Sequence, residues 1–154
     1  MFRKLIQWLY LHQKNNLAYF DVSLGIHNRN YYERVLKKKY RNKAVVIAII
    51  DLNDLKKIND TEGHMCGDII LQNLSKTLQS APGCLDCVRY GGDEFVMFHD
   101  GSVNLKDILE NFASVWNKSF SFGEYNKKKT DDITYALTKA DKTMYYFKRK
   151  GKSE

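Results

Sequence analysis

The segment from Ala44 to Ile50 is an unbroken run of apolar residues, and it constrains the fold more than any other feature of the chain. A strand with one face in water alternates apolar and polar side chains, so a continuous run predicts a strand buried on both faces. Such a strand belongs to a central sheet with helices covering both sides. The chain has 154 residues, which suffices for one domain with a substantial core.

Amphipathic periodicity predicts the helices that would cover this sheet. An N-terminal amphipathic helix is expected over residues 1–20, in front of a domain spanning residues 21–154 that begins with a turn over Asp21–Gly25. Within the domain we predict helices over Asn30–Tyr40, Asp68–Gln79, Val103–Trp116 and Asp131–Lys148, and a short one from Lys56 to Gly63. The side chains expected to point inward are Tyr31, Val35, Leu36, Ile69, Ile70, Leu74, Leu78, Ala136, Ala140, Met144 and Phe147.

The pentapeptide Gly91–Phe95 is the clearest chemical signal. Cys87–Tyr90 and Phe95–Phe98 are typical of two strands joined as a hairpin, and the glycines allow a tight turn that approaches a ligand closely. Two carboxylates follow the turn at once. Magnesium binds oxygen and usually takes one or two carboxylates together with substrate phosphates, so the pattern favours a metal–nucleotide site.

Asp51 ends the apolar strand and is a second source of carboxylate. If the hairpin lies beside this strand, Asp51 converges with Asp93 and Glu94, and three carboxylates in one place repel each other unless a cation neutralises them. One or two magnesium ions that clamp phosphate oxygens would provide that charge. The alternative role, capping the following helical turn, suits Asp54 better than Asp51.

A longer motif surrounds Asp51 and extends to Asp68. Its matching positions are Asp51, Lys56, Ile58, Asn59, Asp60, Gly63, His64, Gly67 and Asp68. Together with Asn28-Arg29, Arg89-Tyr90, Ser121-Phe122-Gly123 and the run from Ala140 to Gly151, this series resembles the GGDEF domain, the catalytic domain of diguanylate cyclases. The resemblance covers about residues 21–152 and implies a palm-like fold of the mixed α/β type, with a mostly antiparallel sheet.

The resemblance also implies roles for individual residues. It implies metal binding by Asp51, Asp93, Glu94 and Leu52, with the three acids as the catalytic residues. Asn59 and Asp68 would read guanine, because a carboxylate accepts from the donors on the guanine edge that adenine lacks. The residues that would contact the triphosphate are Asp54, Leu55, Lys56, Lys148 and Lys152. Gly91 and Gly92 would let the backbone of the hairpin approach the nucleotide closely. For Lys148 and Lys152 the alternative is a favourable interaction with the helix dipole.

The implied reaction condenses two GTP molecules into cyclic di-GMP with Mg²⁺ or Mn²⁺, across a transient homodimer. Many members of the family carry an Arg-x-x-Asp product-inhibition site before the signature. Here that place holds Pro82–Cys87 without a matching Arg, so this feedback site is expected to be absent.

Charge and cysteine content add expectations about partners and location. The net charge of +7 favours anionic partners, among which the resemblance selects GTP over nucleic acid. Three cysteines without a secretory leader indicate a reducing compartment, and the resemblance implies a cytoplasmic protein of bacterial or phage origin. No apolar stretch is long enough for a transmembrane segment, although the basic, aromatic N-terminal segment leaves weak membrane-surface contact open.

Three alternatives remain open at this stage. The domain can be a regulatory module that binds GTP or cyclic di-GMP without efficient turnover, although its intact signature acids favour an enzyme. It can be a related cyclase that uses ATP, which Asn59 and Asp68 oppose. Finally, Cys84 and Cys87 can bind zinc together with His64 and Cys66, although an odd separation along a strand would point the two thiols to opposite faces.

Overall fold

The computed structural model describes residues 18–150, and side chains from Ala18 to Arg149. The predicted N-terminal helix therefore lies almost wholly outside the described residues, and Phe20, which was placed at its end, belongs to a short strand instead. The strands are β1 (Phe20–Asp21), β2 (Ile26–Asn28), β3 (Val45–Leu52), β4 (Cys84–Arg89), β5 (Glu94–His99) and β6 (Phe120–Lys127). The helices are α2 (Arg29–Tyr31), the π-helical η1 (Tyr32–Leu36), α3 (Lys37–Lys39), α4 (Leu55–Glu62), α5 (His64–Ser80), α6 (Leu105–Trp116) and α7 (Ile133–Lys150).

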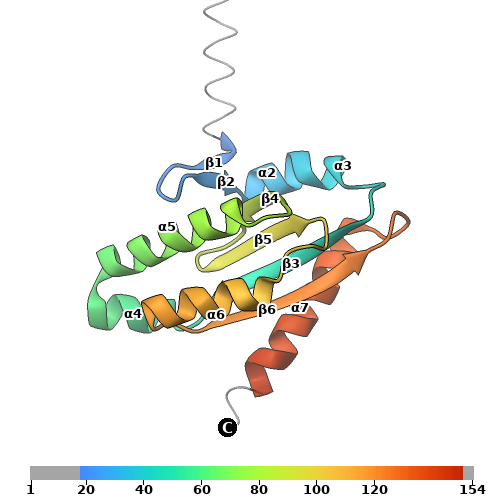
Figure 1. Ribbon diagram of the computed structural model, residues 1–154. Coiled ribbons are helices and arrows are strands. Elements are labelled where there is room, and N and C mark those ends of the chain that lie inside the picture. The colour runs from blue at the N-terminus through green and yellow to red at the C-terminus, as the bar shows by residue number, and fades with distance from the viewer. Residues whose placement is uncertain (1–17, 151–154) are drawn as a thin grey trace, which may run out of the picture.

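The six strands form one sheet in the order β1-β2-β4-β5-β3-β6 (Figure 1). All neighbouring pairs are antiparallel except β2 and β4. The apolar strand β3 lies inside the sheet, between β5 and β6, as its composition predicts. The predicted fold class, a mostly antiparallel sheet flanked by helices, is confirmed.

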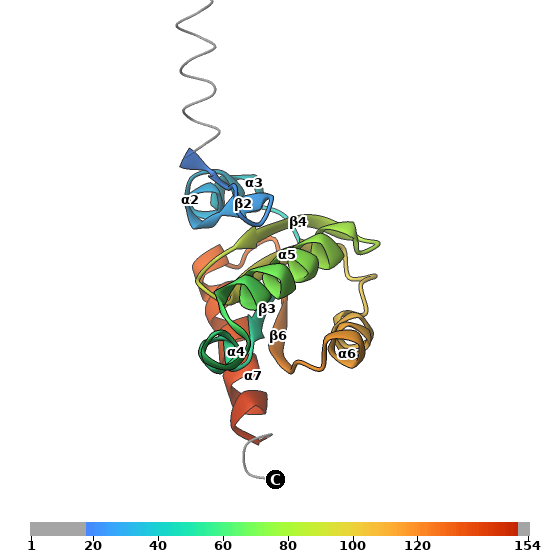
Figure 2. The ribbon, with the colours of Figure 1, turned by 90° about the vertical axis from the view of Figure 1, so that its left-hand side faces the viewer.

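Successive side chains of β3 enter two separate cores. Ala48 and Ile50 pack in the core beneath α5 and α6, whereas Ile47 and Ile49 pack in the core that η1 and α7 cover. Figure 2 shows this layered arrangement along the sheet, with α5 and α6 on the side away from α7. Because Asp51 continues the phase of Ile47 and Ile49, its carboxylate lies on the face that α7 covers.

The helix after β2 begins at Arg29, one residue before the predicted Asn30, and Asn28 caps it by accepting hydrogen bonds from the N–H groups of Asn30 and Tyr31. Its middle turns are π-helical, so they hold more residues per turn than an α-helix. This changes which side chains face the sheet: Tyr32, Leu36 and Tyr40 are fully buried, whereas the predicted Tyr31 and Val35 are only partly buried. The sequence thus predicted the helix correctly, but of its three side chains predicted to point inward only Leu36 is fully buried.

Two other side chains that were expected inside are exposed. Ile69 of α5 is 42% exposed, because Ile70, Leu71, Leu74 and Leu78 form the buried stripe of that helix. Phe147 of α7 is 58% exposed, and Met144, three residues earlier, is the last buried apolar residue among the described side chains of that helix. The other side chains of α5 and α7 that were predicted to point inward are buried, as expected. They are Ile70, Leu74, Leu78, Ala136, Ala140 and Met144.

The far end of β6 is held by a lysine inside the protein. Lys127 is 2% exposed, and its Nζ donates to the carbonyl oxygens of Arg41, Lys43 and Lys128 at 2.9–3.1 Å. These three bonds satisfy the buried ammonium group. They join the connection before β3 to the turn between β6 and α7.

A glycine in the middle of β6 lets α7 approach the sheet closely. A Cβ atom on Gly123 would lie 2.2 Å from the carbonyl oxygen of Ala140 and 2.4 Å from the backbone nitrogen of Met144. Only glycine fits there without moving backbone. The position of α7, and of the residues near its C-terminal end, therefore depends on Gly123.

Candidate nucleotide and metal site

Two carboxylates face each other across the central strands. Asp51 of β3 and Glu94 of β5 are Cα partners in the sheet, on the face that α7 covers. Asp51 is 6% exposed, and Lys148 of α7 places its Nζ 2.6 Å from Asp51 Oδ1. The ammonium of Lys148 thus supplies one positive charge to a pair of acids that the sheet holds together.

The pKa of Glu94 is raised by its surroundings. Burial is the largest cause, followed by the nearby negative charges of Asp51, Asp93 and Asp141, while Lys148 acts in the opposite direction. The negative charges are therefore incompletely neutralised by the lysine, and the site favours an additional proton or cation. Asp141 has no place in the predicted site, although its spacing of seven residues from Lys148 puts both on one face of a helix.

The turn that carries Asp93 is built by backbone hydrogen bonds. The N–H groups of Tyr90 and Gly91 both donate to the carbonyl oxygen of Glu94, and the N–H of Leu52 donates to the carbonyl oxygen of Asp93. A Cβ atom on Gly91 would lie 2.7 Å from Glu94 Oε2, so glycine leaves room for that carboxylate. The predicted hairpin is confirmed, and it is longer than the sequence indicated.

Arg89 braces this turn from one side. Its Nε and Nη2 donate to the carbonyl oxygens of Gly91 and Gly92, at 2.7–3.2 Å. Its Nη1 forms an ion pair with Asp21 Oδ2 at 2.7 Å. The guanidinium therefore connects the entry into the domain with the turn between the two signature strands. From the sequence, Arg89 is only a position that matches the family, and Asp21 is only the first residue of a turn.

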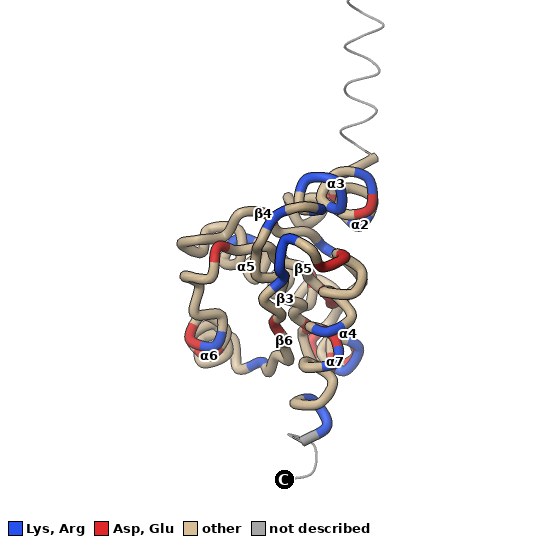
Figure 3. Tube along the Cα trace, turned by 90° about the vertical axis from the view of Figure 1, so that its right-hand side faces the viewer, with Lys and Arg blue, Asp and Glu red and all other residues tan. Residues whose placement is uncertain are grey.

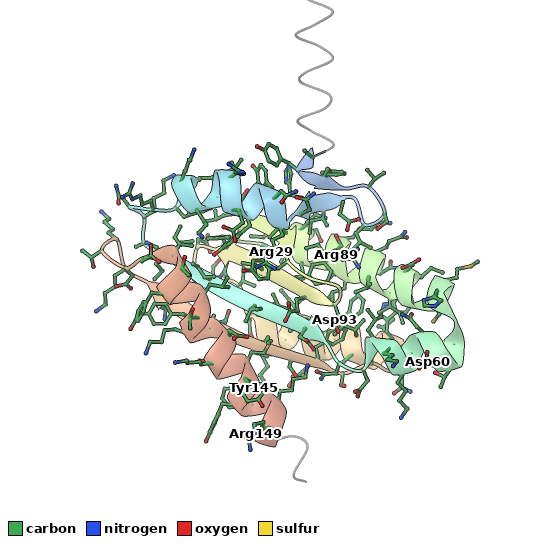
Figure 4. The ribbon with its side chains drawn as sticks, turned by 180° about the vertical axis from the view of Figure 1, so that it is seen from behind. Arg29, Asp60, Arg89, Asp93, Tyr145 and Arg149 are labelled. Atoms are coloured by element: carbon green, nitrogen blue, oxygen red, sulfur yellow. The ribbon has the colours of Figure 1, made fainter. Side chains whose placement is uncertain are left out.

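Figure 4 looks onto this face of the molecule. Arg29 and Arg89 lie near the turn that holds Asp93, and Tyr145 and Arg149 lie along α7. The guanidinium of Arg29 is stacked over the ring of Tyr90, 4.5 Å from its centroid. Figure 3 shows Lys and Arg residues at the C-terminal end of α7, so this edge of the site carries positive charge.

Asn59 of α4 presents an unusual oxygen atom. Its Oδ1 is buried and has no hydrogen-bond partner in the described part of the chain. A Cβ atom on Gly67 of α5 would lie 2.1 Å from that oxygen, so the glycine keeps space beside it. A buried polar atom without a partner is costly, which suggests that it is satisfied when a ligand binds. Asp68, the next residue of α5, is exposed.

The connection from β3 to α4 leaves backbone N–H groups available. Asp54 adopts a left-handed conformation, with φ of 58°, and its side chain makes no capping hydrogen bond. The first N–H groups of α4, including those of Leu55 and Lys56, lack partners within the helix by construction. The N-terminus of a helix attracts anions such as phosphate. Asp54 thus occupies the N-cap position of α4, as the sequence suggested, but its side chain does not cap the helix.

The structure brings the predicted site residues together only in part. Asp51 pairs with Glu94 in the sheet and forms an ion pair with Lys148, and Asp93 lies in the adjoining turn, whereas Lys152 is outside the described residues. Within residues 18–149, no three His, Cys, Asp or Glu side chains are already placed to hold a metal ion. The expected convergence of three carboxylates is thus incomplete. The acids fit a cation that also takes oxygen from substrate phosphates, as magnesium does.

The zinc alternative gains no support in the described residues. The Sγ of Cys66 donates to Glu62 at 3.3 Å, and Cys84 and Cys87 lie on β4. Both β4 thiols pack against the same core, although their odd spacing predicted opposite faces. An irregularity in the strand register between Cys84 and Asp86 accounts for this difference.

Comparison with known proteins identifies the family. The family model "Diguanylate cyclase, GGDEF domain" matches residues 18–118, more than half of the chain. The chain belongs to the GGDEF family. Diguanylate cyclase DgcS of Shewanella oneidensis is 32% identical over 152 residues, which cover 88% of this chain and 51% of that relative. The response regulator PleD of Caulobacter vibrioides is 38% identical over 87 residues, covering 53% of this chain and 19% of PleD.

Solved structures of GGDEF proteins have the same fold. A structure of the coiled coil and GGDEF domain of DgcB from Caulobacter crescentus, in complex with c-di-GMP, matches with a TM-score of 0.82 at 21% identity, covering 97% of this chain and 90% of that one. A microbial GGDEF domain with bis-(3,5) cyclic di-GMP matches with a TM-score of 0.74 at 27% identity, over 87% and 92% of the two chains. The palm-like architecture is thereby confirmed.

The GGDEF chain is shorter than its curated relatives. It spans about half of DgcS and 46% of diguanylate cyclase VdcA of Vibrio cholerae, which is 27% identical over 88% of this chain. None of the helices in residues 18–150 is long and apolar enough to cross a membrane.

Proposed function

We propose that this GGDEF domain is a diguanylate cyclase that condenses two GTP molecules into cyclic di-GMP and two pyrophosphates. The observation that carries the proposal is the Asp51–Glu94 pair, whose charge Lys148 only partly compensates. Such a pair, next to a helix N-terminus and a lysine, suits a nucleoside triphosphate bound with a divalent cation.

Asp51, Glu94, Asp93 and the carbonyl oxygen of Leu52 would hold Mg²⁺ or Mn²⁺. When bound, the cation neutralises phosphate charge and makes a 3′-hydroxyl group easier to deprotonate. These are the residues that the family resemblance assigns, and the acids in this structure have the hard oxygen donors that such cations take.

The chain's own side chains would orient the nucleotide. The unpaired Oδ1 of Asn59 and the carboxylate of Asp68 accept hydrogen bonds from the donor groups of guanine. Lys56, Lys148 and Lys152, together with the backbone N–H groups of Asp54, Leu55 and Lys56, hold the triphosphate. Gly91 and Gly92 let the ribose and the α-phosphate approach the hairpin closely.

The reaction would join two nucleotides held by two facing domains. The 3′-oxygen of one GTP attacks the α-phosphorus of the other, the bond to the β-phosphate oxygen breaks, and pyrophosphate leaves. The proton of the hydroxyl group passes to Glu94 or Asp93. A second identical step closes the ring. Most of the rate enhancement would come from positioning and electrostatics.

Incubation with each nucleoside triphosphate and Mg²⁺, followed by mass analysis of the products, tests the proposal. We expect cyclic di-GMP and pyrophosphate from GTP alone, and none from Asp51→Asn. GTP binding without product would favour the regulatory-module alternative, and cyclic products from ATP would favour a cyclase with a different base preference. A folded Asp51→Asn variant with the wild-type rate would remove the metal assignment.

A further inference from the structure

The helix α4 carries groups of the proposed nucleotide site, yet little of it is buried. Of its residues, Leu55–Glu62, only Ile58 is fully buried. The helix nevertheless carries Lys56 and Asn59, and its first N–H groups are the proposed phosphate donors. Packing of an apolar face is what usually holds a short helix in place. Because that face is small here, the position of α4 also depends on the segment that leads into it.

Asp54, the residue directly before α4, has an unfavourable backbone conformation. Its φ of 58° is left-handed, and its side chain makes no capping hydrogen bond. This region is disfavoured for residues with a side chain, although a local hydrogen bond can offset the cost for an aspartate. Such a conformation persists where neighbouring contacts hold the backbone. The contacts of the preceding residue, Asn53, therefore decide how the chain enters the helix.

Asn53 makes three hydrogen bonds to one short stretch of the chain. Its backbone N–H donates to the carbonyl oxygen of Ser119 at 3.0 Å. Its Nδ2 donates to Ser119 Oγ at 3.2 Å, and its Oδ1 accepts from Ser121 Oγ at 2.8 Å. The amide thus uses its donor and its acceptor at once, which fixes the orientation of the side chain.

The two serines are anchored to the sheet that carries the acids. Ser119 directly precedes β6, and every residue of β6 pairs with β3. Ser121 is 8% exposed and is the Cα partner of Asp51. The hydroxyl group that orients Asn53 therefore lies beside the strand position of a proposed metal ligand. Asn53 in this way fixes the N-terminus of α4 relative to Asp51.

We propose that Asn53 is a positioning residue for the triphosphate of the bound nucleotide. Held by Ser119 and Ser121, it keeps the first N–H groups of α4 where the phosphates bind. Because its Oδ1 and Nδ2 already have partners, it acts through the backbone that follows it. The inference rests on the proposed nucleotide site, but ligand binding alone reports it and no turnover is required.

Titration calorimetry of the full chain tests this proposal without turnover. The ligands are inorganic triphosphate and a GTP analogue with a methylene group in place of the α,β-bridging oxygen, each with Mg²⁺. We expect Asn53→Ala to bind both about 10-fold more weakly, because the N–H groups are no longer held toward the phosphates. A purely structural role would instead lower the melting temperature and leave the affinity of the folded protein unchanged. Asn111→Ala, at an exposed position of α6, is the matched control.

A second substitution tests whether Asn53 acts through its serine partner. Ser121→Ala should also weaken triphosphate binding, since it removes the hydrogen bond to Asn53 Oδ1. The double variant Asn53→Ala/Ser121→Ala should bind no more weakly than Asn53→Ala alone, because both changes break the same link. Losses that add up, or wild-type affinity in folded Asn53→Ala, would overturn the proposal.

The result is separable from that of the proposed function. A wild-type protein that binds both ligands but makes no cyclic di-GMP would refute the cyclase, whereas weaker binding by Asn53→Ala would still support the positioning role. A wild-type protein that binds neither ligand would overturn the positioning role itself, because there would be no phosphate site for Asn53 to position.

Discussion

Gly67 is the residue on which the Asn59 side chain depends most directly. A methyl group at Gly67 would lie 2.1 Å from Asn59 Oδ1, so Gly67→Ala must displace that amide. We expect GTP binding to weaken at least 10-fold, or about 1.4 kcal/mol, while the fold survives. Titration with a fluorescent GTP analogue measures this. Met65→Ala, 77% exposed on the same helix, is the control, and equal affinity in Gly67→Ala would contradict a role of Asn59 in base recognition.

Glu94 gives the metal-free protein a distinctive dependence on pH. Its pKa is raised above the ordinary value of 4.5, so the folded state binds this proton more tightly than the unfolded chain does. The stability contributed at low pH is therefore lost as the pH rises from about 4.5 through the raised folded value. We expect Glu94→Gln to have the higher melting temperature above that window, and the difference to vanish below it.

Thermal denaturation in a chelator, repeated across pH, measures this difference. Glu110→Gln, an exposed change on α6, is the control. Added Mg²⁺ should reverse the order of wild type and Glu94→Gln, since a cation favours the ionised carboxylate. A Glu94→Gln variant that is less stable than wild type at neutral pH without metal would show that the charge repulsion is compensated elsewhere.

Individual site residues differed in how far the sequence could predict them. Asp51 and Glu94 were accessible because a buried strand and a signature hairpin have obvious registers. Asp141 was not, since its influence on Glu94 acts through space from a helix far along the chain. The Asp21–Arg89 pair, 68 residues apart, likewise requires the fold to be known.

At the scale of elements, the buried faces of the helices were harder to predict than their positions. The pattern after Asn28 indicates a helix correctly, yet the π-helical turns of η1 shift the buried face toward Tyr32. Periodicity of 3.6 residues cannot anticipate this change. The prediction for Phe147 was wrong for another reason, because an apolar stripe does not show which of its side chains the rest of the protein covers.

The signature turn is an element whose shape depends on one guanidinium group. Arg89→Ala removes the hydrogen bonds to the carbonyl oxygens of Gly91 and Gly92. We expect kcat to fall at least 10-fold, about 1.4 kcal/mol in the barrier, with GTP affinity changed less than twofold. Steady-state kinetics and a binding titration separate the two effects.

Arg89→Lys should not restore the rate, because one ammonium group cannot reproduce the planar fork that reaches two carbonyl oxygens and Asp21. Arg34→Ala, an exposed change in η1, is the control. Wild-type kcat in Arg89→Ala would show that the turn keeps its shape without the side chain.

The whole molecule must meet a second copy if each domain binds one GTP. We expect specific activity to rise with protein concentration, and to fall when residues 1–17 are deleted, which leaves β1 intact. Activity measured over a dilution series, alongside sedimentation, tests this. Specific activity that does not change with concentration would refute weak dimerisation.

Product inhibition is the second property of the whole molecule that the sequence and the fold address together. The segment before the signature contains Asp86 but no matching Arg, and Asp86 Oδ2 already binds Lys39 Nζ at 2.6 Å and the hydroxyl of Tyr40. Added cyclic di-GMP should therefore inhibit only by competition with GTP, as initial rates at several GTP concentrations would reveal. Strong non-competitive inhibition would place a product site elsewhere.

Labelling of the buried Lys127 amine would measure how often the domain opens locally around the end of β6. Its Nζ is enclosed by the carbonyl oxygens of Arg41, Lys43 and Lys128, so an amine-modifying reagent meets it only after those contacts separate. Exposed neighbours such as Lys129 react from the start and calibrate the reagent. The rate at which Lys127 is labelled therefore reports how often β6 separates from the connection before β3. Mass spectrometry measures this rate without any introduced probe.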